Sequence, residues 1–303
     1  MLERLAGEGL KEQRRARRWN IFFKCLFFAY VTALLVLYMP KLDLWPSDAA
    51  EQHTALVEVN GVIASDSDAS ADNVISAMRR AFEDENTAGV ILRINSPGGS
   101  PVQSGYINDE IVRLREKYPD TPLYAVITDL CASGGYYIAA AADKIYADKS
   151  SIIGSIGVLM NGFGFVDAME KIGVERRLIT AGEHKGLLDP FSPLNEAEVV
   201  HLRGVIDRMH QQFIDVVKRG RGDRIQAQSD LFSGLVWTGE RSIALGLVDA
   251  LGTSSGVARD VIGAETVVDF TLRAGVLDRL AERFGAAIGR AMATSVVPQF
   301  ELR

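Results

Sequence analysis

Short apolar runs of strand length alternate with helical patterns between residues 55 and 128. The apolar runs lie at 55–63, 90–94 and 123–128, and residues 72–85 and 103–117 carry apolar side chains at helical intervals. This alternation is typical of βαβ units, whose consecutive strands are parallel and buried on both faces. We therefore predict an α/β fold built on a largely parallel sheet.

The same rhythm continues after residue 128. The pattern predicts a strand at 144–147, a helix at 163–172, a strand at 176–180 and a long helix that begins after Asn195 and ends near Gly220. The long helix carries one apolar stripe, formed by Leu202, Val205, Ile206, Met209, Phe213, Val216 and Val217. We interpret the two histidines of this helix, His201 and His210, as surface or boundary residues.

Residues 21–39 form an apolar segment of nineteen residues with a single charge, Lys24. Its length matches the hydrocarbon core of a bilayer, and Arg14, Arg15, Arg17 and Arg18 precede it. The alternative is a cleaved signal peptide, but the run is long and no small-residue cleavage site follows it. We predict a single transmembrane helix whose basic end is cytoplasmic and whose following domain lies outside the cytoplasm.

Five segments follow from these patterns. They are a cytoplasmic basic segment (1–20), the transmembrane helix (21–39), a linker (40–53), the main domain (54–270), and an amphipathic helix with a tail (271–303). The apolar face of the last helix fits a partner subunit or a membrane surface equally well.

Charge and composition exclude several classes of function. The net charge is −6, so a general nucleic-acid binder is not expected. The four histidines and two cysteines show no metal-binding spacing, and two cysteines make no disulfide framework. We predict neither a metal nor a cofactor.

Ser133 is the first candidate for a reactive group. It is followed by Gly134 and Gly135 and then by a run of small residues. Glycines let the chain turn sharply and leave backbone amides free to bind an oxyanion. The alternative is an ordinary serine at the start of a helix.

A reactive serine needs a base, and the sequence offers few. Ser254 lies in a GxSxG pattern, but no histidine follows His210, so that triad order is not available. Among the nine lysines, Lys185 is the one in a glycine-bounded loop after an expected strand. An ordinary solvated lysine is the alternative, and His184 keeps a serine–histidine pair open.

Five motifs together resemble the bacterial signal peptide peptidase A family, which comprises membrane-anchored serine/lysine proteases of the ClpP/crotonase superfamily. They are NSPGG at 95–99, ASGGYYIAAAADKI at 132–145, GSIGV at 154–158, GEHKG at 182–186 and WTGERSIALGLVDALG at 237–252. The resemblance spans about residues 55–252 and implies a fold of repeated ββα units.

The resemblance also implies roles for individual residues. Ser133 is the nucleophile and Lys185 the general base, Gly99 and Gly134 supply the oxyanion-hole amides, and Ser155 holds the lysine. These roles make the expected activity that of a serine endopeptidase with a Ser/Lys dyad.

Partners and location follow from the same resemblance. The substrates are cleaved signal peptides or other unfolded peptides near the membrane, and the catalytic domain lies on the periplasmic side of a bacterial inner membrane. The chain has one copy of the domain, so subunits are expected to form a homo-oligomeric ring in which Lys185 of one subunit reaches Ser133 of the next.

His184 departs from the family, which has an aromatic residue before the lysine. The alternatives are a crotonase-like acyl-CoA hydratase or isomerase, and an inactive membrane scaffold.

Overall fold

A computed structural model describes residues 15, 17–33, 51–226 and 230–273, and its contacts divide the chain into the units Met1–Glu51 and Gln52–Arg303. In the first unit, residues 17–33 are helical. No helix within the described residues is both long and apolar enough to span a membrane. Residues 34–39 of the predicted transmembrane segment lie outside the described residues, as does the predicted amphipathic helix near the C-terminus.

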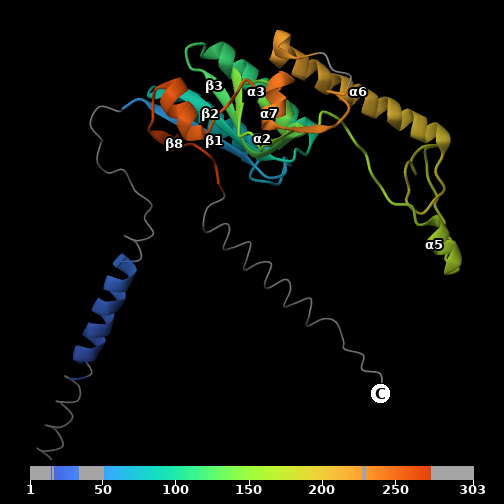
Figure 1. Cartoon of the computed structure of the whole chain (residues 1–303). Coiled ribbons are helices and arrows are strands. Elements are labelled where there is room, and N and C mark those ends of the chain that lie inside the picture. Colours follow the sequence, from blue (N-terminus) through green and yellow to red (C-terminus); the bar gives the residue numbers. More distant parts are fainter. Residues whose placement is uncertain (1–14, 16, 34–50, 227–229, 274–303) are drawn as a thin grey trace, which may run out of the picture. The chain divides into compact units, whose positions relative to one another are not determined.

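One sheet of eight strands forms the centre of the second unit, as far as the structure describes it (Figure 1). The strands are β1 (His53–Asn60), β2 (Thr87–Ser96), β3 (Leu123–Ala132), β4 (Lys144–Ala147), β5 (Ile152–Gly154), β6 (Val236–Thr238), β7 (Ala250–Leu251) and β8 (Val267–Asp269). The main path runs β6-β5-β3-β2-β1-β8, and β4 pairs with β3 and β7. All pairings are parallel except β5 with β6. The predicted α/β fold with a largely parallel sheet is confirmed.

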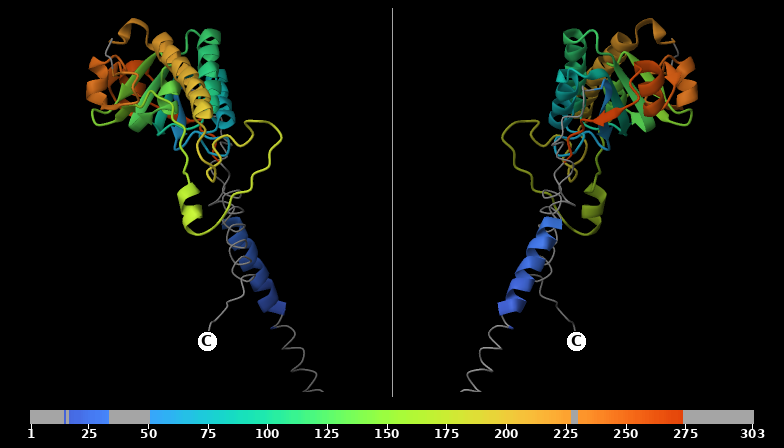
Figure 2. Two further views of the ribbon diagram at one scale, coloured as in Figure 1. Left: turned by 90° about the vertical axis from the view of Figure 1, so that its right-hand side faces the viewer. Right: turned by 90° about the vertical axis from the view of Figure 1, so that its left-hand side faces the viewer.

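Helices and helical turns pack around this sheet, except the helix α5 (Val166–Lys171), which lies away from it in the segment that follows β5 (Figure 2). They are α2 (Ala71–Glu83), α3 (Pro101–Lys117), α4 (Gly134–Ala139), α5 (Val166–Lys171), α6 (Glu196–Arg221), α7 (Gly239–Ala244) and α8 (Ser254–Gly256), with a 3-10 turn at Gly222–Arg224 and a π-helical turn at Val257–Ile262. The predicted long helix is α6, and Asn195 caps it by accepting a hydrogen bond from the Ala197 amide at 3.0 Å.

The core has two layers because side chains alternate between the faces of each strand. On β1, Val57 joins the large cluster that includes α2, α3 and α4, while Leu56 joins a smaller cluster with the π-helical turn. On β2, Leu92 belongs to the large cluster and Ile91 to the smaller one, and both side chains are fully buried. Each such side chain stabilises the fold by about 1.5–3 kcal/mol relative to an exposed one.

The stretch between β5 and α6 differs from the prediction. Residues 176–180, predicted as a strand, are irregular, and the helix predicted at 163–172 is the shorter α5, which has no buried residue. A β-strand needs a neighbouring strand for its backbone hydrogen bonds, and no described strand pairs with this stretch. We call residues 159–194 the apolar arm, because none of them is buried and many are apolar.

Candidate active site

Ser133 lies between β3 and α4 in a backbone conformation that is rare for a residue with a side chain. Its φ is 51° and its ψ is −121°. Hydrogen bonds fix it on both sides: the Ser133 amide donates to the Gly154 carbonyl at 2.9 Å, and the Ser133 carbonyl accepts from the Tyr137 amide at 3.0 Å. Conformations of this kind cost about 1–3 kcal/mol and persist where the surrounding structure enforces them, often at functional sites.

Two backbone amides approach Ser133 from neighbouring turns. Gly99 precedes α3 and has a φ of 153°, and a Cβ atom there would overlap the Ile63 carbonyl oxygen. A Cβ atom on Gly134 would lie 3.3 Å from the Gly99 nitrogen, so the two glycine amides are close together. Within the described residues, neither amide donates a backbone hydrogen bond. Both N–H groups are therefore free to bind an oxyanion.

Ser155 follows β5, the strand beside β3. It also has a positive φ, 52°, and its amide donates to the Leu235 carbonyl at 2.7 Å. Ser155, Ser133 and Gly99 line one groove of about 600 Å³. The structure thus brings four of the five predicted site residues together, since Gly134 directly follows Ser133.

Lys185, the fifth predicted site residue, is not at this site. It lies in the apolar arm with an exposed side chain, and its amide donates to the Gly182 carbonyl at 3.1 Å. Among the described residues, Ser133 lines a groove of about 600 Å³ and a smaller cavity, and Lys185 lines neither. Its neighbour His184 is also exposed and lies 3.1 Å from a Glu198 carboxylate oxygen, at the start of α6.

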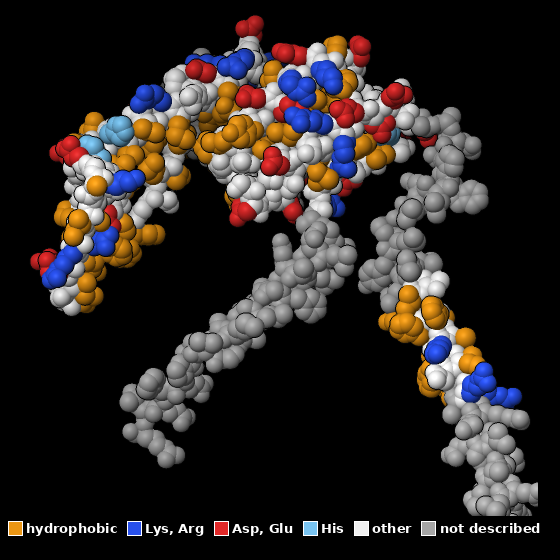
Figure 3. Space-filling model, turned by 180° about the vertical axis from the view of Figure 1, so that it is seen from behind, with side chains coloured by type: hydrophobic (Ala, Val, Ile, Leu, Met, Phe, Trp, Pro, Cys, Tyr) orange, Lys and Arg blue, Asp and Glu red, His pale blue; other side chains and the backbone are white. Residues whose placement is uncertain are grey.

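The apolar arm presents large hydrophobic side chains without a covering layer. Figure 3 shows apolar side chains gathered along it, and the most exposed are Leu159 (81%), Phe163 (81%), Ile172 (73%), Ile179 (95%) and Leu194 (75%). Continuous apolar surfaces of this kind mark sites of contact with another molecule. The part of the chain that carries Lys185 therefore has the character of an interface.

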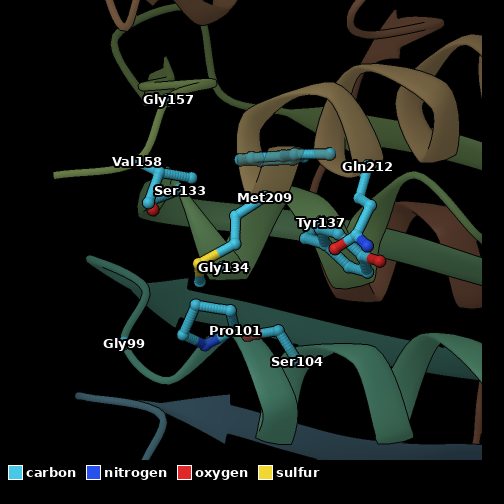
Figure 4. A pocket seen from close by; sticks show the side chains of 11 residues that line it. Gly99, Pro101, Ser104, Ser133, Gly134, Tyr137, Gly157, Val158, Met209 and Gln212 are labelled. Carbon is cyan, nitrogen blue, oxygen red and sulfur yellow. The ribbon is translucent and has the colours of Figure 1, made fainter. Parts of the chain in front are cut away.

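A second, smaller cavity of about 70 Å³ opens beside Ser133 (Figure 4). Its lining includes residues that sequence reasoning did not assign to the site: Pro101, Ser104, Tyr137, Met209, Gln212 and Phe213. Met209 and Phe213 belong to the predicted apolar stripe of α6, which gave the signal that they face inward. These two side chains face a cavity because α6 crosses the ends of β3 and β5. The apolar stripe of α6 does not predict where the helix crosses the sheet.

The described residues give no support to the alternative that a histidine is the base for Ser133. No histidine lines either cavity that contains Ser133. His210 lies on α6 with its Nε2 atom 3.2 Å from the Ile156 carbonyl oxygen, which places it at a boundary as predicted. Ser254 lines a different cavity at the edge of the sheet, together with Asp129 and Asp148.

A strained serine next to two free backbone amides on a parallel α/β sheet defines the class of serine hydrolases. Comparison with known proteins narrows this class. The family model described as "Peptidase family S49" matches residues 115–265. A Synechocystis protein named "Putative protease slr0021" is 33% identical over 211 residues, which cover 69% of this chain and 74% of that protein. The chain belongs to peptidase family S49.

Other relatives agree with this assignment or add little to it. A protein of Enterococcus faecium named "Putative signal peptide peptidase SppA" is 29% identical over 232 residues, covering 74% of this chain and 67% of that protein. A Brucella abortus protein named "Na(+)/H(+) antiporter NhaA" is 44% identical over 186 residues, covering 61% of this chain. The chain spans only 25% of that protein's length. The name of the longer protein is therefore no evidence that this chain is an antiporter.

Proposed function

We propose that this protein is a membrane-anchored serine endopeptidase with a Ser/Lys dyad shared between subunits. Ser133 is the nucleophile, and Lys185 of a neighbouring copy is the general base. The observation that carries the proposal is the enforced positive φ of Ser133 beside the free amides of Gly99 and Gly134. This arrangement suits attack on a carbonyl whose oxygen becomes negatively charged.

The chemistry proceeds in two balanced steps. The Ser133 hydroxyl oxygen attacks the peptide carbonyl carbon while its proton passes to the Lys185 amine, and the Gly99 and Gly134 amides bind the oxyanion. Collapse of the tetrahedral intermediate breaks the C–N bond, and the lysine returns the proton to the leaving amine. Water, deprotonated by the same lysine, then hydrolyses the acyl-enzyme and regenerates Ser133.

The position of Lys185 supports a site completed by a second copy. In one chain the Ser133 hydroxyl has no hydrogen-bond partner among the described residues, and Lys185 lies in the apolar arm. Docking of this arm on a neighbouring copy would bury its apolar side chains, and burial in an interface favours the neutral form of a lysine. Repetition of the same contact around an axis closes a ring.

Substrates and location are part of the same proposal. A groove of about 600 Å³ open to solvent fits an extended, unfolded peptide such as a cleaved signal peptide. The apolar segment at 21–39 and the arginines before it favour an anchor in the bacterial inner membrane with the catalytic domain on the periplasmic side. Alkaline phosphatase fused to the C-terminus should then be active, and an inactive fusion beside an active cytoplasmic reporter would reverse this orientation.

Single substitutions test the dyad. Ser133→Ala and Lys185→Ala should each lower kcat on an unfolded peptide by a factor of about 1,000 or more, because nucleophile and base act as a unit. Lys171→Ala is the matched control, since Lys171 is an exposed lysine of the same arm. Wild-type activity in either dyad variant would overturn the assignment.

A further inference from the structure

A single polar contact joins the apolar arm to the rest of its domain. The arm follows β5, carries α5 and returns to the start of α6 (Figure 1). Most of its hydrogen bonds are internal, such as that from the Phe165 amide to the Pro190 carbonyl at 2.7 Å. The exception is His184, whose Nδ1 atom lies 3.1 Å from a carboxylate oxygen of Glu198 in the first turn of α6. Among the described residues, no other hydrogen bond, ion pair or ring contact leaves the arm.

Apolar packing adds little to this attachment. Met160 and Leu188 of the arm line one hollow of about 420 Å³ together with Leu202 and Ile206 of α6. Side chains that face an open hollow lack the close contacts that packed side chains make. The contact between His184 and Glu198 therefore carries a large share of the attachment of the arm to α6.

Lys185 directly follows this contact in the chain. The Lys185 amide donates to the Gly182 carbonyl at 3.1 Å, and the Leu187 amide donates to the His184 carbonyl at 3.2 Å. We call residues 182–187 the lysine loop. These two local hydrogen bonds make the loop one unit, so a displacement of His184 moves Lys185 with it.

Glu198 is well suited to hold a histidine. Its side chain is only 14% exposed, and the dipole of α6 favours a negative charge in the first turn. A carboxylate only accepts hydrogen bonds, so the Nδ1 atom of His184 carries the proton and donates it. Among the described residues, Glu198 has no second side-chain partner. The carboxylate is therefore committed to His184.

Helix α6 connects this contact to the serine site of the same chain. Met209 lines both cavities at Ser133. It follows Glu198 by about three helical turns, or about 16 Å along the helix axis. One helix thus borders the Ser133 site and holds the lysine loop three turns away, which suits delivery of Lys185 to another copy.

We propose that His184 and Glu198 are positioning residues for Lys185: their hydrogen bond fixes the lysine loop to α6 at the place from which Lys185 enters the groove of a neighbouring copy. The inference rests on the proposed shared dyad and adds two residues to it. Neither residue touches the substrate, and both act on the rate through the placement of the lysine.

The test compares variants of the full-length enzyme on an unfolded peptide, with kcat and KM measured on the assembled fraction isolated by gel filtration. His184→Phe keeps a ring of similar size without the N–H group, and Glu198→Ala removes the acceptor. Each should lower kcat about five- to tenfold with little change in KM, because a misplaced base slows the chemical step. Glu198→Gln should stay within about twofold of the wild-type kcat, because its amide oxygen accepts the same hydrogen bond.

A double variant shows whether the two residues act together. His184→Phe combined with Glu198→Ala should be no slower than either single variant, because the first substitution already breaks the contact. The matched controls are Glu196→Ala and His201→Ala, which remove an exposed glutamate and an exposed histidine of the same helix. Both should keep the wild-type kcat.

Three results would overturn the inference and leave the peptidase intact. They are full kcat in His184→Phe, loss of kcat in Glu198→Gln equal to that in Glu198→Ala, and additive losses in the double variant. Absence of cleavage by the wild type, or full activity in Lys185→Ala, would instead overturn the proposed function, and the inference with it.

Discussion

Ser133 and Ser155 occupy equivalent positions at the ends of two neighbouring parallel strands. In the pairing of β3 with β5, Ala132 lies opposite Gly154, and each serine is the next residue of its strand. Both have a positive φ, 51° at Ser133 and 52° at Ser155, and the Ser133 amide donates to the Gly154 carbonyl. The sheet therefore presents two strained serines side by side in one groove.

Removal of the Ser155 hydroxyl tests whether this pairing serves catalysis. Ser155→Ala should lower kcat about 10- to 100-fold, because a base that loses its support is misplaced relative to the nucleophile. Ser155→Gly should be about 1 kcal/mol more stable than Ser155→Ala, since glycine adopts a positive φ without strain. Steady-state kinetics and urea unfolding measure the two effects. Full kcat in Ser155→Ala would show that the hydroxyl has no role.

The amide of Gly99 is tested by a side chain at that position. Gly99→Ala should lower kcat about 100-fold or more, because the new Cβ overlaps the Ile63 carbonyl and displaces the amide that we propose for the oxyanion hole. Gly105→Ala, in the interior of α3, is the matched control: a Cβ there meets no atom within 4 Å. The control should keep full activity and gain stability. Equal activity in the Gly99→Ala and Gly105→Ala variants would contradict the assignment of the Gly99 amide to the oxyanion hole.

Stability at acidic pH depends on Glu110, a residue of α3 that is hydrogen-bonded to Arg79 of α2. Hydrogen bonds from Arg113 and Arg79 lower the pKa of the buried Glu110 carboxyl to about 2. A lowered pKa contributes stability that is present above the unfolded-state value, about 4.3, and is lost as the pH falls towards 2. Because both arginines are half-exposed, we expect a contribution of about 1–2 kcal/mol near pH 6.

Urea unfolding of the wild type and Glu110→Gln as a function of pH measures this contribution. The difference in unfolding free energy should shrink between about pH 4.5 and pH 2. Glu116→Gln, an exposed residue of the same helix, should show little difference at any pH. A Glu110→Gln difference that stays constant down to pH 2 would contradict the assignment.

The central strands and the turn that carries Ser133 were predictable because their signals are local. The apolar runs at 55–63, 90–94 and 123–128 overlap β1, β2 and β3, and the glycines after Ser133 mark the turn into α4. Strand β4 has the predicted bounds, Lys144–Ala147. Residues in these segments bury their own apolar faces within one chain, so their periodicity is enough to place them.

The apolar arm was not predictable in the same way. Residues 176–180 have a strand-like pattern, yet a strand forms only where a partner backbone lies beside it, and the pattern contains no information on that partner. The position of Met209 was also not predictable from the sequence pattern alone. Its spacing on α6 predicts an inward direction, but only the crossing of α6 over the ends of β3 and β5 places it at a cavity beside Ser133.

The shared site is the central claim, and mixing two inactive variants tests it most directly. Ser133→Ala chains retain Lys185, and Lys185→Ala chains retain Ser133, so a mixed assembly contains contacts in which both groups are intact. Co-expressed variants, purified through two different tags to ensure that both are in one assembly, should recover at least a tenth of wild-type peptidase activity. Each variant alone should remain inactive. A confirmed mixed assembly without activity would contradict a site shared between subunits.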